Sequence, residues 1–349
     1  MRSLKIIFKK SLIYVLLLPA LLCTGCNRTE QTPLASTRTS AETAEKLKIV
    51  CTVFPQYDWV VQILGDVADE YELTLLLSSR MDLHNYQPSV EDIVRIQSSD
   101  LFIYVGGVSD DWVEEALDRT RNPNGIVVNL IEVLGDSTKL EDIIEGMDHA
   151  HDDDYDHDNG VDESDHDEED REFDEHVWLS LKNAQTFCAT IADALTLLDP
   201  ENAEVFASNL NAYTQELSSL DDLYQEAVNT ASIKTLLFGD RFPFRYLLDD
   251  YEITYYAAFP GCSAETEASF TTIIFLAGKV DELDIKKIIV TESTDKLVAE
   301  TIINSSREKN QQILVLDSMQ SVTPWDIQNG TTYCSIMERN LSVLVEALK

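Results

Sequence analysis

Basic residues are scarce in this sequence. Lys and Arg number 26 against 63 Asp and Glu, so the formal net charge is -37. A nucleic-acid-binding surface needs clustered positive charge to contact phosphates, and this composition therefore excludes nucleic acid as a partner. An acidic surface suits cations as ligands. The sequence also has no HExxH and no GxSxG pattern, so neither a zincin-type protease nor a hydrolase with a nucleophile elbow is indicated.

The N-terminus lacks an apolar run long enough to cross a membrane. The stretch SLIYVLLLPALLC follows four basic residues, but it is shorter than the roughly 20 residues that a membrane helix needs. It predicts a secretory signal. The small residues and Cys26 that follow resemble a bacterial lipobox, so Cys26 is the predicted lipidation site. We expect residues 1–26 to be a lipoprotein signal and residues 27–46 a flexible tether. The body then sits outside the cytoplasm, anchored to the bacterial cell membrane.

Cysteine is sparse, and its spacing in the predicted mature chain is not that of a structural zinc site. Cys51, Cys188, Cys262 and Cys334 remain after processing, and no two of them form a CxxC pair. Export permits disulfides, and Cys262 and Cys334 both lie in the second half of the chain. Because sequence does not determine connectivity, their pairing stays open.

Histidine is rare and unevenly placed. The chain has six, and five of them fall between Asp148 and Trp178, a stretch with sixteen Asp or Glu and a single basic residue. Such a polyanionic tract cannot bury a core, so residues 148–172 are predicted to be a disordered, solvated loop. Imidazoles and carboxylates are ligands for divalent cations. We expect weak cation gathering by the loop histidines, which are His149, His151, His157 and His166.

From Leu47 onward, short apolar or β-branched runs alternate with amphipathic stretches. This rhythm predicts an α/β fold with parallel sheets covered by helices. Asp199 as N-cap and Pro200 as the first helical residue predict the start of a helix. Apolar residues at spacings of three and four then continue to about residue 230 and predict one long helix. We therefore predict two α/β lobes, 47–198 and 231–349, joined by a helix over 199–230. The predicted strands are 47–53, 72–77, 101–105, 126–131, 235–238, 253–257, 287–291 and 313–316.

Polar residues at the ends of predicted strands are the candidates for a binding site, because such sheets bind ligands at the carboxyl ends of their strands. Two imidazoles with one or more carboxylates make a four-coordinate site for a divalent transition metal. A single strand-end Asp is usually a helix cap and a single loop His is usually solvated, so the set as a whole carries the prediction. The candidates are His84, His176, Asp240, Arg241, Glu292 and Asp317.

Several motifs together resemble one known family, and they cover the body from Leu47 to the C-terminus. They are FPQYDWVVQILGD, DLHNYQPSVEDI, DEHVWLSLKNA after an acid-rich insertion, FGDRFPFRYLLDDY, TEST, LDSMQSV and YCSIMERNLSVL. They resemble the metal-type substrate-binding lipoproteins of ABC importers, which capture zinc or manganese outside the cell. The resemblance implies two Rossmann-like lobes joined by a long helix, with a metal between them. It also implies that the insertion is a mobile loop near the cleft entrance.

Carried over position by position, the resemblance implies that His84, His176 and Asp317 are metal ligands. The family's remaining ligand position falls on Arg241, whose guanidinium keeps its proton and cannot coordinate a cation. Asp240 is therefore predicted as the fourth ligand, with Arg241 paired to a nearby carboxylate.

Two further acidic residues bear on the site. Glu292 is predicted either to replace a ligand or to orient one, and Asp174 is predicted to support the site from beside His176. Position 175 also departs from the family pattern, because Glu175 stands where the family usually has Pro.

The function predicted from these features is binding, not catalysis. The chain is expected to hold a divalent metal, zinc first and manganese as the alternative, and to deliver it as a monomer to an ABC permease and its ATPase. Two histidines favour zinc, whereas extra carboxylates favour manganese. Other hypotheses are a surface adhesin or metal buffer that acts through the acidic tract, and a zinc hydrolase with Glu292 or Asp240 as general base.

Overall fold

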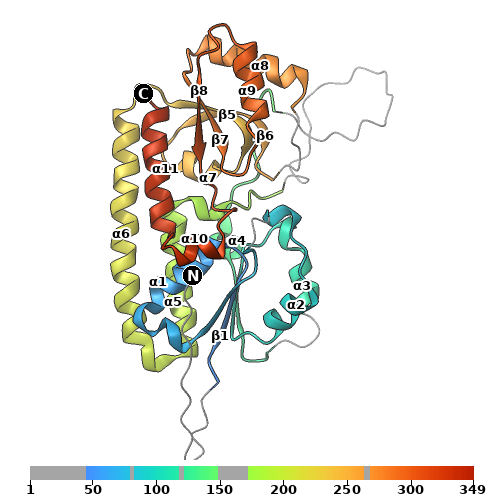
Figure 1. Ribbon diagram of the computed structural model, residues 1–349. Helices are drawn as coiled ribbons and strands as arrows, with labels where there is room; N and C mark the ends of the chain where they lie inside the picture. Colours follow the sequence, from blue (N-terminus) through green and yellow to red (C-terminus); the bar gives the residue numbers. More distant parts are fainter. Residues whose placement is uncertain (1–44, 79–81, 118–121, 148–171, 263–267) are drawn as a thin grey trace, which may run out of the picture. The chain divides into compact units, whose positions relative to one another are not determined.

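The computed structural model describes residues 45–78, 82–117, 122–147, 172–262 and 268–349 (Figure 1). All of them belong to one compact unit, Glu45–Lys349. The predicted disordered loop, its four histidines and the lipidation site at Cys26 lie outside the described residues, except for residue 172 at the end of the loop. None of the described helices is both long and apolar enough to span a membrane.

The first sheet has four parallel strands in the order β2-β1-β3-β4. Its strands are β1 Lys48–Cys51, β2 Glu72–Leu75, β3 Leu101–Tyr104 and β4 Ile126–Asn129. The helical segments around it are α1 Phe54–Leu64, η1 Gly65–Glu70, η2 Leu83–Asn85, α2 Val90–Gln97, η3 Val108–Asp110, α3 Trp112–Leu117, α4 Leu130–Leu134 and η4 Gly135–Ser137. Apolar strands covered by helices form a parallel sheet, as the sequence predicts.

The second sheet repeats this topology, with four parallel strands in the order β6-β5-β7-β8. Its strands are β5 Thr235–Phe242, β6 Thr254–Pro260, β7 Lys287–Thr291 and β8 Gln312–Leu316. The helices of this part are α7 Arg245–Asp250, α8 Phe270–Glu282, α9 Leu297–Ser305, α10 Pro324–Gln328 and α11 Tyr333–Ala347. Each predicted strand is present in one of the two sheets, and the predicted fold class is confirmed.

A helical stretch connects the two sheets, and its long member α6 stands out in Figure 1. It comprises η6 Val177–Leu179, α5 Leu181–Leu198, η7 Pro200–Asn202 and α6 Ala203–Thr230. The 28 residues of α6 extend over about 42 Å. The helix packs against α1 and α5 beside the first sheet and against α11 beside the second. One long helix therefore contacts both halves, as predicted.

The start of this helix differs from the prediction. Asp199 does not cap an α-helix, because Pro200–Asn202 form a 3-10 turn and α6 begins at Ala203. The Asp199 carboxylate accepts hydrogen bonds from the Tyr71 hydroxyl at 2.5 Å and from the Asn202 amide at 2.9 Å. A tertiary contact with the first lobe thus takes the carboxylate that the local sequence assigns to the helix start.

The cysteines form no disulfide in the described residues. Cys51, Cys188, Cys262 and Cys334 are all free thiols. The sulfur of Cys334 lies 3.6 Å from the Tyr213 hydroxyl. The pairing of Cys262 with Cys334, which the sequence leaves open, does not occur, and this leaves the Cys262 thiol available for another role.

The two segments that flank residues 148–171 are joined to each other. Leu140 and Phe173 form an antiparallel bridge, and the amide of Asp174 donates to the carbonyl of Lys139 at 2.9 Å. The Tyr246 hydroxyl accepts from the amide of Lys139 and donates to the carbonyl of Asp174. His176 follows this pinned segment by two residues, so its backbone belongs to the folded body and not to the acidic tract.

Candidate metal centre

His84 sits in the short turn η2, after β2. The Asp82 carboxylate caps this turn by accepting from the His84 amide at 3.1 Å. Its other oxygen pairs with Arg241 Nη1 at 2.6 Å. Arg241 lies near the end of β5, so the second sheet contributes a cation that fixes the cap of the first histidine. The predicted pairing of Arg241 with a carboxylate is therefore observed, and its partner is Asp82.

His176 is fully buried directly before η6. One carboxylate oxygen of Asp174 accepts from both its backbone amide, at 2.8 Å, and its ring Nδ1, at 3.0 Å. A carboxylate behind the distal ring nitrogen is the usual support of a metal-binding histidine, because it fixes the ring and raises its basicity. Asp174 thus lies where a supporting residue is predicted.

The two imidazoles face each other through their Nε2 atoms, which lie 3.3 Å apart. The Nδ1 of His84 lies 2.8 Å from the Ser109 hydroxyl and 3.2 Å from a Glu175 carboxylate oxygen. Asp174 accepts from Nδ1 of His176, and the Ser109 hydroxyl and Glu175 lie beside Nδ1 of His84, so both Nε2 atoms can present a lone pair to a cation. At this distance the two Nε2 atoms can share a proton in a hydrogen bond, and a metal cation can take the place of that proton.

Glu175 holds the first histidine in place, and the sequence did not identify this role. Its second carboxylate oxygen accepts from the Ser109 amide at 2.7 Å. Gly107 allows this approach because a Cβ there would lie 2.5 Å from the Glu175 carboxylate, and its φ of +85° favours glycine. The only hint in the sequence was the replacement of the family's usual Pro by a residue with a carboxylate.

The electrostatics of this region favour positive charge. Burial works against the charged form of His84, but the hydrogen bond with Glu175 and the charges of Asp82 and Glu175 raise its pKa above the usual value. Burial likewise opposes the ionised form of Glu175, but hydrogen bonds from His84 and Ser109 hold its pKa below the usual range. The same carboxylates that stabilise an imidazolium also stabilise a metal cation.

A third potential ligand reaches the histidines from the second sheet. Three atoms lie within 4.8 Å of one another: the sulfur of Cys262, one ring nitrogen of His84 and one ring nitrogen of His176. Cys262 is not among the ligands predicted from the sequence. Burial raises the pKa of its thiol, and the charges of Glu141 and Asp174 raise it further. Two features of the sequence could have pointed to Cys262 as a ligand. It lies two residues after strand β6, and the position where the family has a ligand is occupied by Arg241.

The predicted carboxylate ligands are not part of this cluster. Both hydrogen bonds that Asp240 accepts come from Thr291, from the amide at 2.9 Å and from the hydroxyl at 2.5 Å, so it braces the end of β7. Asp317 lines a hollow of about 130 Å³ together with Glu292 and Arg339, and neither histidine lines this hollow. Glu292 accepts from the Ser318 amide and hydroxyl. The structure therefore does not place Asp240 or Asp317 with the two histidines, and their role as ligands stays a prediction.

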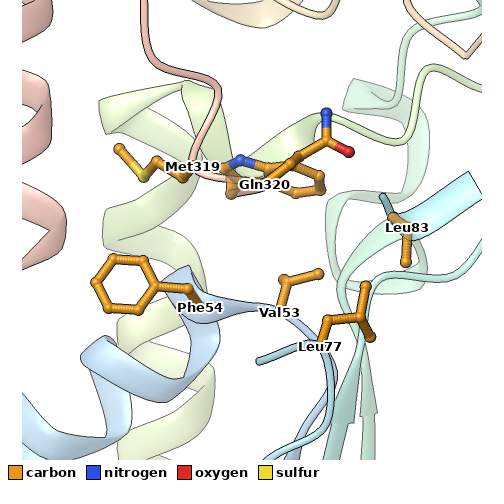
Figure 2. Close-up of a pocket in the computed structure, with 7 residues that line it drawn as sticks. Val53, Phe54, Leu77, Leu83, Met319 and Gln320 are labelled. Carbon is orange, nitrogen blue, oxygen red and sulfur yellow. The ribbon is translucent and has the colours of Figure 1, made fainter. Parts of the chain in front are cut away.

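The residues that line an apolar pocket include Leu83, which precedes His84 in the sequence, and Trp178, two residues after His176. Figure 2 shows this pocket with Leu83 at its wall. Met319 and Gln320 lie across from Val53 and Phe54 in this view. Its volume is about 10 Å³, room for one water at most. Apolar walls beside a metal centre limit solvent access and strengthen its electrostatic contacts.

Replacing Asp174 with Asn should weaken zinc binding by about 10-fold to 100-fold, because the neutral amide polarises the His176 ring less than a carboxylate. Competition against a chromophoric chelator measures this change. Asp193→Asn on the exposed side of α5 is the matched control and should leave the affinity unchanged. Equal affinity in the two variants would contradict a supporting role for Asp174.

This donor set fits one kind of metal best. Two imidazole nitrogens and a sulfur are ligands that zinc accepts in tetrahedral sites, whereas manganese prefers carboxylate, carbonyl and water oxygens. Three protein ligands also leave a fourth position open. The geometry is therefore that of a centre that can take up and release a zinc ion.

Comparison with known proteins agrees with this geometry. A family profile described as "Zinc-uptake complex component A periplasmic" matches residues 49–347. The zinc-binding lipoprotein AdcA of Streptococcus pneumoniae is 31% identical over 299 residues, which cover 86% of this chain and 55% of AdcA. The high-affinity zinc uptake system protein ZnuA of Bacillus subtilis is 29% identical over 343 residues, 98% of both chains.

A solved structure extends the similarity to the fold. The crystal structure of the Zn(II)-bound ZnuA-like domain of Streptococcus pneumoniae AdcA aligns with a TM-score of 0.65 and 27% identity, covering 87% of this chain and 99% of that one. The chain thus spans about half the length of the AdcA relatives it matches, and the matching half is their ZnuA-like domain.

Proposed function

We propose that this chain, which belongs to the periplasmic zinc-uptake component A family, captures a zinc ion outside the cytoplasm and delivers it to an ABC permease and its ATPase. The observation that carries the proposal is the pair of histidines whose Nε2 atoms face each other at 3.3 Å, each backed by a carboxylate. In this function zinc is the cargo and not a catalytic cofactor. A binding protein needs a site that holds the ion and then releases it, and no reacting substrate.

The names of relatives support zinc as the cargo. AdcA of Streptococcus pneumoniae is named a zinc-binding lipoprotein, and ZnuA of Bacillus subtilis is named a zinc uptake protein. Manganese is the alternative cargo, and the nitrogen and sulfur donors near the histidine pair argue against it. The proposal also includes the lipid anchor at Cys26, the monomeric state and weak cation gathering by the acidic tract.

Metal content and competition titration test the proposal. The full chain, purified without chelator, should retain one zinc ion per chain, and added zinc should displace manganese but not the reverse. Because zinc binds only the folded state, it should also stabilise the chain against unfolding. At a free zinc concentration 1,000 times the dissociation constant, the free energy of unfolding should rise by about 4 kcal/mol, and the unfolding midpoint should rise with it. Absence of tight zinc binding, or a preference for manganese, would overturn the zinc assignment.

A further inference from the structure

The position of Cys262 is fixed by its surroundings. Strand β6 ends at Pro260, and Gly261 passes so close to His176 that a Cβ on it would lie 3.2 Å from the ring and 2.8 Å from the Phe242 carbonyl. The backbone amide of Cys262 then donates to a Glu141 carboxylate oxygen at 2.8 Å. Glycine thus lets the chain pass beside the imidazole, and the next residue presents its thiol to the histidine pair.

The two sheets supply their ligands from equivalent places. His84 follows β2 and Cys262 follows β6. Strand β2 is the edge strand next to β1, and β6 is the edge strand next to β5. The sulfur and one ring nitrogen from each of the two histidines lie within 4.8 Å of one another. We propose that Cys262 is a zinc ligand and that His84, His176 and Cys262 together form a His2Cys centre. This inference rests on the proposed function, because it completes the same site.

The proposal accounts for the arginine at the expected ligand position. Arg241 pairs with Phe259 in the ladder between β5 and β6, three residues before Cys262. The ligand has therefore moved from one strand to the neighbouring strand of the same sheet. Arg241 uses its charge to hold Asp82, which caps the turn that carries His84. Where the family has a neutral imidazole, this chain has the positively charged Arg241 and the thiolate of Cys262. Their charges cancel, so the formal charge of the centre is unchanged.

A sulfur ligand has consequences for selectivity. Coordination replaces the S–H proton of Cys262, which passes to solvent as the metal binds. Thiolate is a soft ligand that favours zinc and disfavours manganese, which prefers oxygen donors. Cys262 is then the residue that sets the preference of this centre for zinc over manganese.

Cobalt substitution of the wild-type full chain tests the ligand directly. Co(II) bound by a thiolate gives an intense sulfur-to-metal charge-transfer absorption in the near ultraviolet, which nitrogen and oxygen ligands do not give. We expect this band in the wild-type chain and in Cys334→Ala, which removes a buried thiol outside the cluster. In Cys262→Ser the band should disappear, while the visible cobalt bands from the histidines remain.

Zinc competition gives the second readout. Cys262→Ser should bind zinc about 100-fold or more weakly than the wild type and should bind manganese with little change, so the preference for zinc narrows. If the wild-type chain binds zinc tightly but shows no charge-transfer band with cobalt, the assignment of Cys262 is wrong and the proposed function stands. If the wild-type chain does not bind zinc tightly, the proposed function itself fails. The absence of this band from the wild-type spectrum rejects Cys262 as a ligand even where a variant misfolds.

Discussion

Replacing His84 with Ala should weaken zinc binding by about 100-fold or more. A zinc-binding free energy on the order of 10–16 kcal/mol, shared among three protein ligands, gives about 3–5 kcal/mol for each ligand. His84 contributes its Nε2 from a capped turn and is only partly buried, so its loss removes a ligand with little effect on the core. His176→Ala should cost at least as much, because the ring is fully buried and backed by Asp174.

Competition against a chelator of known affinity measures these losses, with unfolding of the metal-free variants as the check on folding. The matched control is a variant with alanine at His149, His151, His157 and His166, which removes the imidazoles of the acidic tract and keeps the pair in the folded body. That variant should keep its tight site. The reverse pattern, with tight binding lost in the control and kept in His84→Ala, would place the site in the tract and would favour the metal-buffer hypothesis.

Replacing Trp178 with Ala should destabilise the metal-free protein by about 3–5 kcal/mol, the usual cost of removing a large buried aromatic side chain. Trp178 is completely buried, and its indole donates to the Ser318 carbonyl at 3.0 Å. Its own carbonyl accepts from the Tyr333 hydroxyl at 2.8 Å. These two bonds join the segment that follows His176 to the end of β8 and the start of α11.

Urea unfolding measures this effect, and Trp325→Ala is the matched control. Trp325 is 70% exposed, so its removal should change the free energy of unfolding by no more than about 0.5 kcal/mol. Because the Trp178 ring lies beside the His176 ring, with centroids 5.3 Å apart, the same variant should also weaken zinc binding. A midpoint for Trp178→Ala equal to that of the control would show that this packing contributes little.

The architecture could be predicted from the sequence because its signals are local. Each strand is a short apolar or β-branched run followed by an amphipathic stretch, and this pattern needs no knowledge of distant contacts. The long helix α6 is also encoded locally, and its buried residues Phe206, Tyr213, Leu217, Leu220, Tyr224 and Val228 follow the predicted spacing. The predicted start of the helix was wrong by a few residues, because the Asp199 carboxylate accepts a hydrogen bond from Tyr71, in a remote segment, and does not cap the helix. The family resemblance is confirmed by the match over residues 49–347.

The site could be predicted only in part. His84 and His176 could be singled out because imidazole is rare in this chain and both residues stand in recognisable motifs, and the structure places their Nε2 atoms 3.3 Å apart. Asp240 and Asp317 were equally plausible, since both follow strands, but a strand-end carboxylate can brace a neighbouring strand as readily as bind an ion. In the structure Asp240 bonds to Thr291, and Asp317 lines a separate hollow. Periodicity places a residue at the end of a strand and does not say which way its side chain points.

The sequence by itself determined the two parallel sheets, the helix between them and the pair of histidines, because these depend on local patterning and on rare residue types. Only the tertiary structure placed Cys262 beside these histidines. Cys262 lies 86 residues from His176 and 178 from His84, and it looked like an ordinary free thiol until the fold brought the three together. The acidic tract marks the approach to His176 in the sequence, but contacts from Asp174, Glu175 and Arg241 set the geometry. Ligand distances depend on how separate segments pack, and no local pattern encodes that packing.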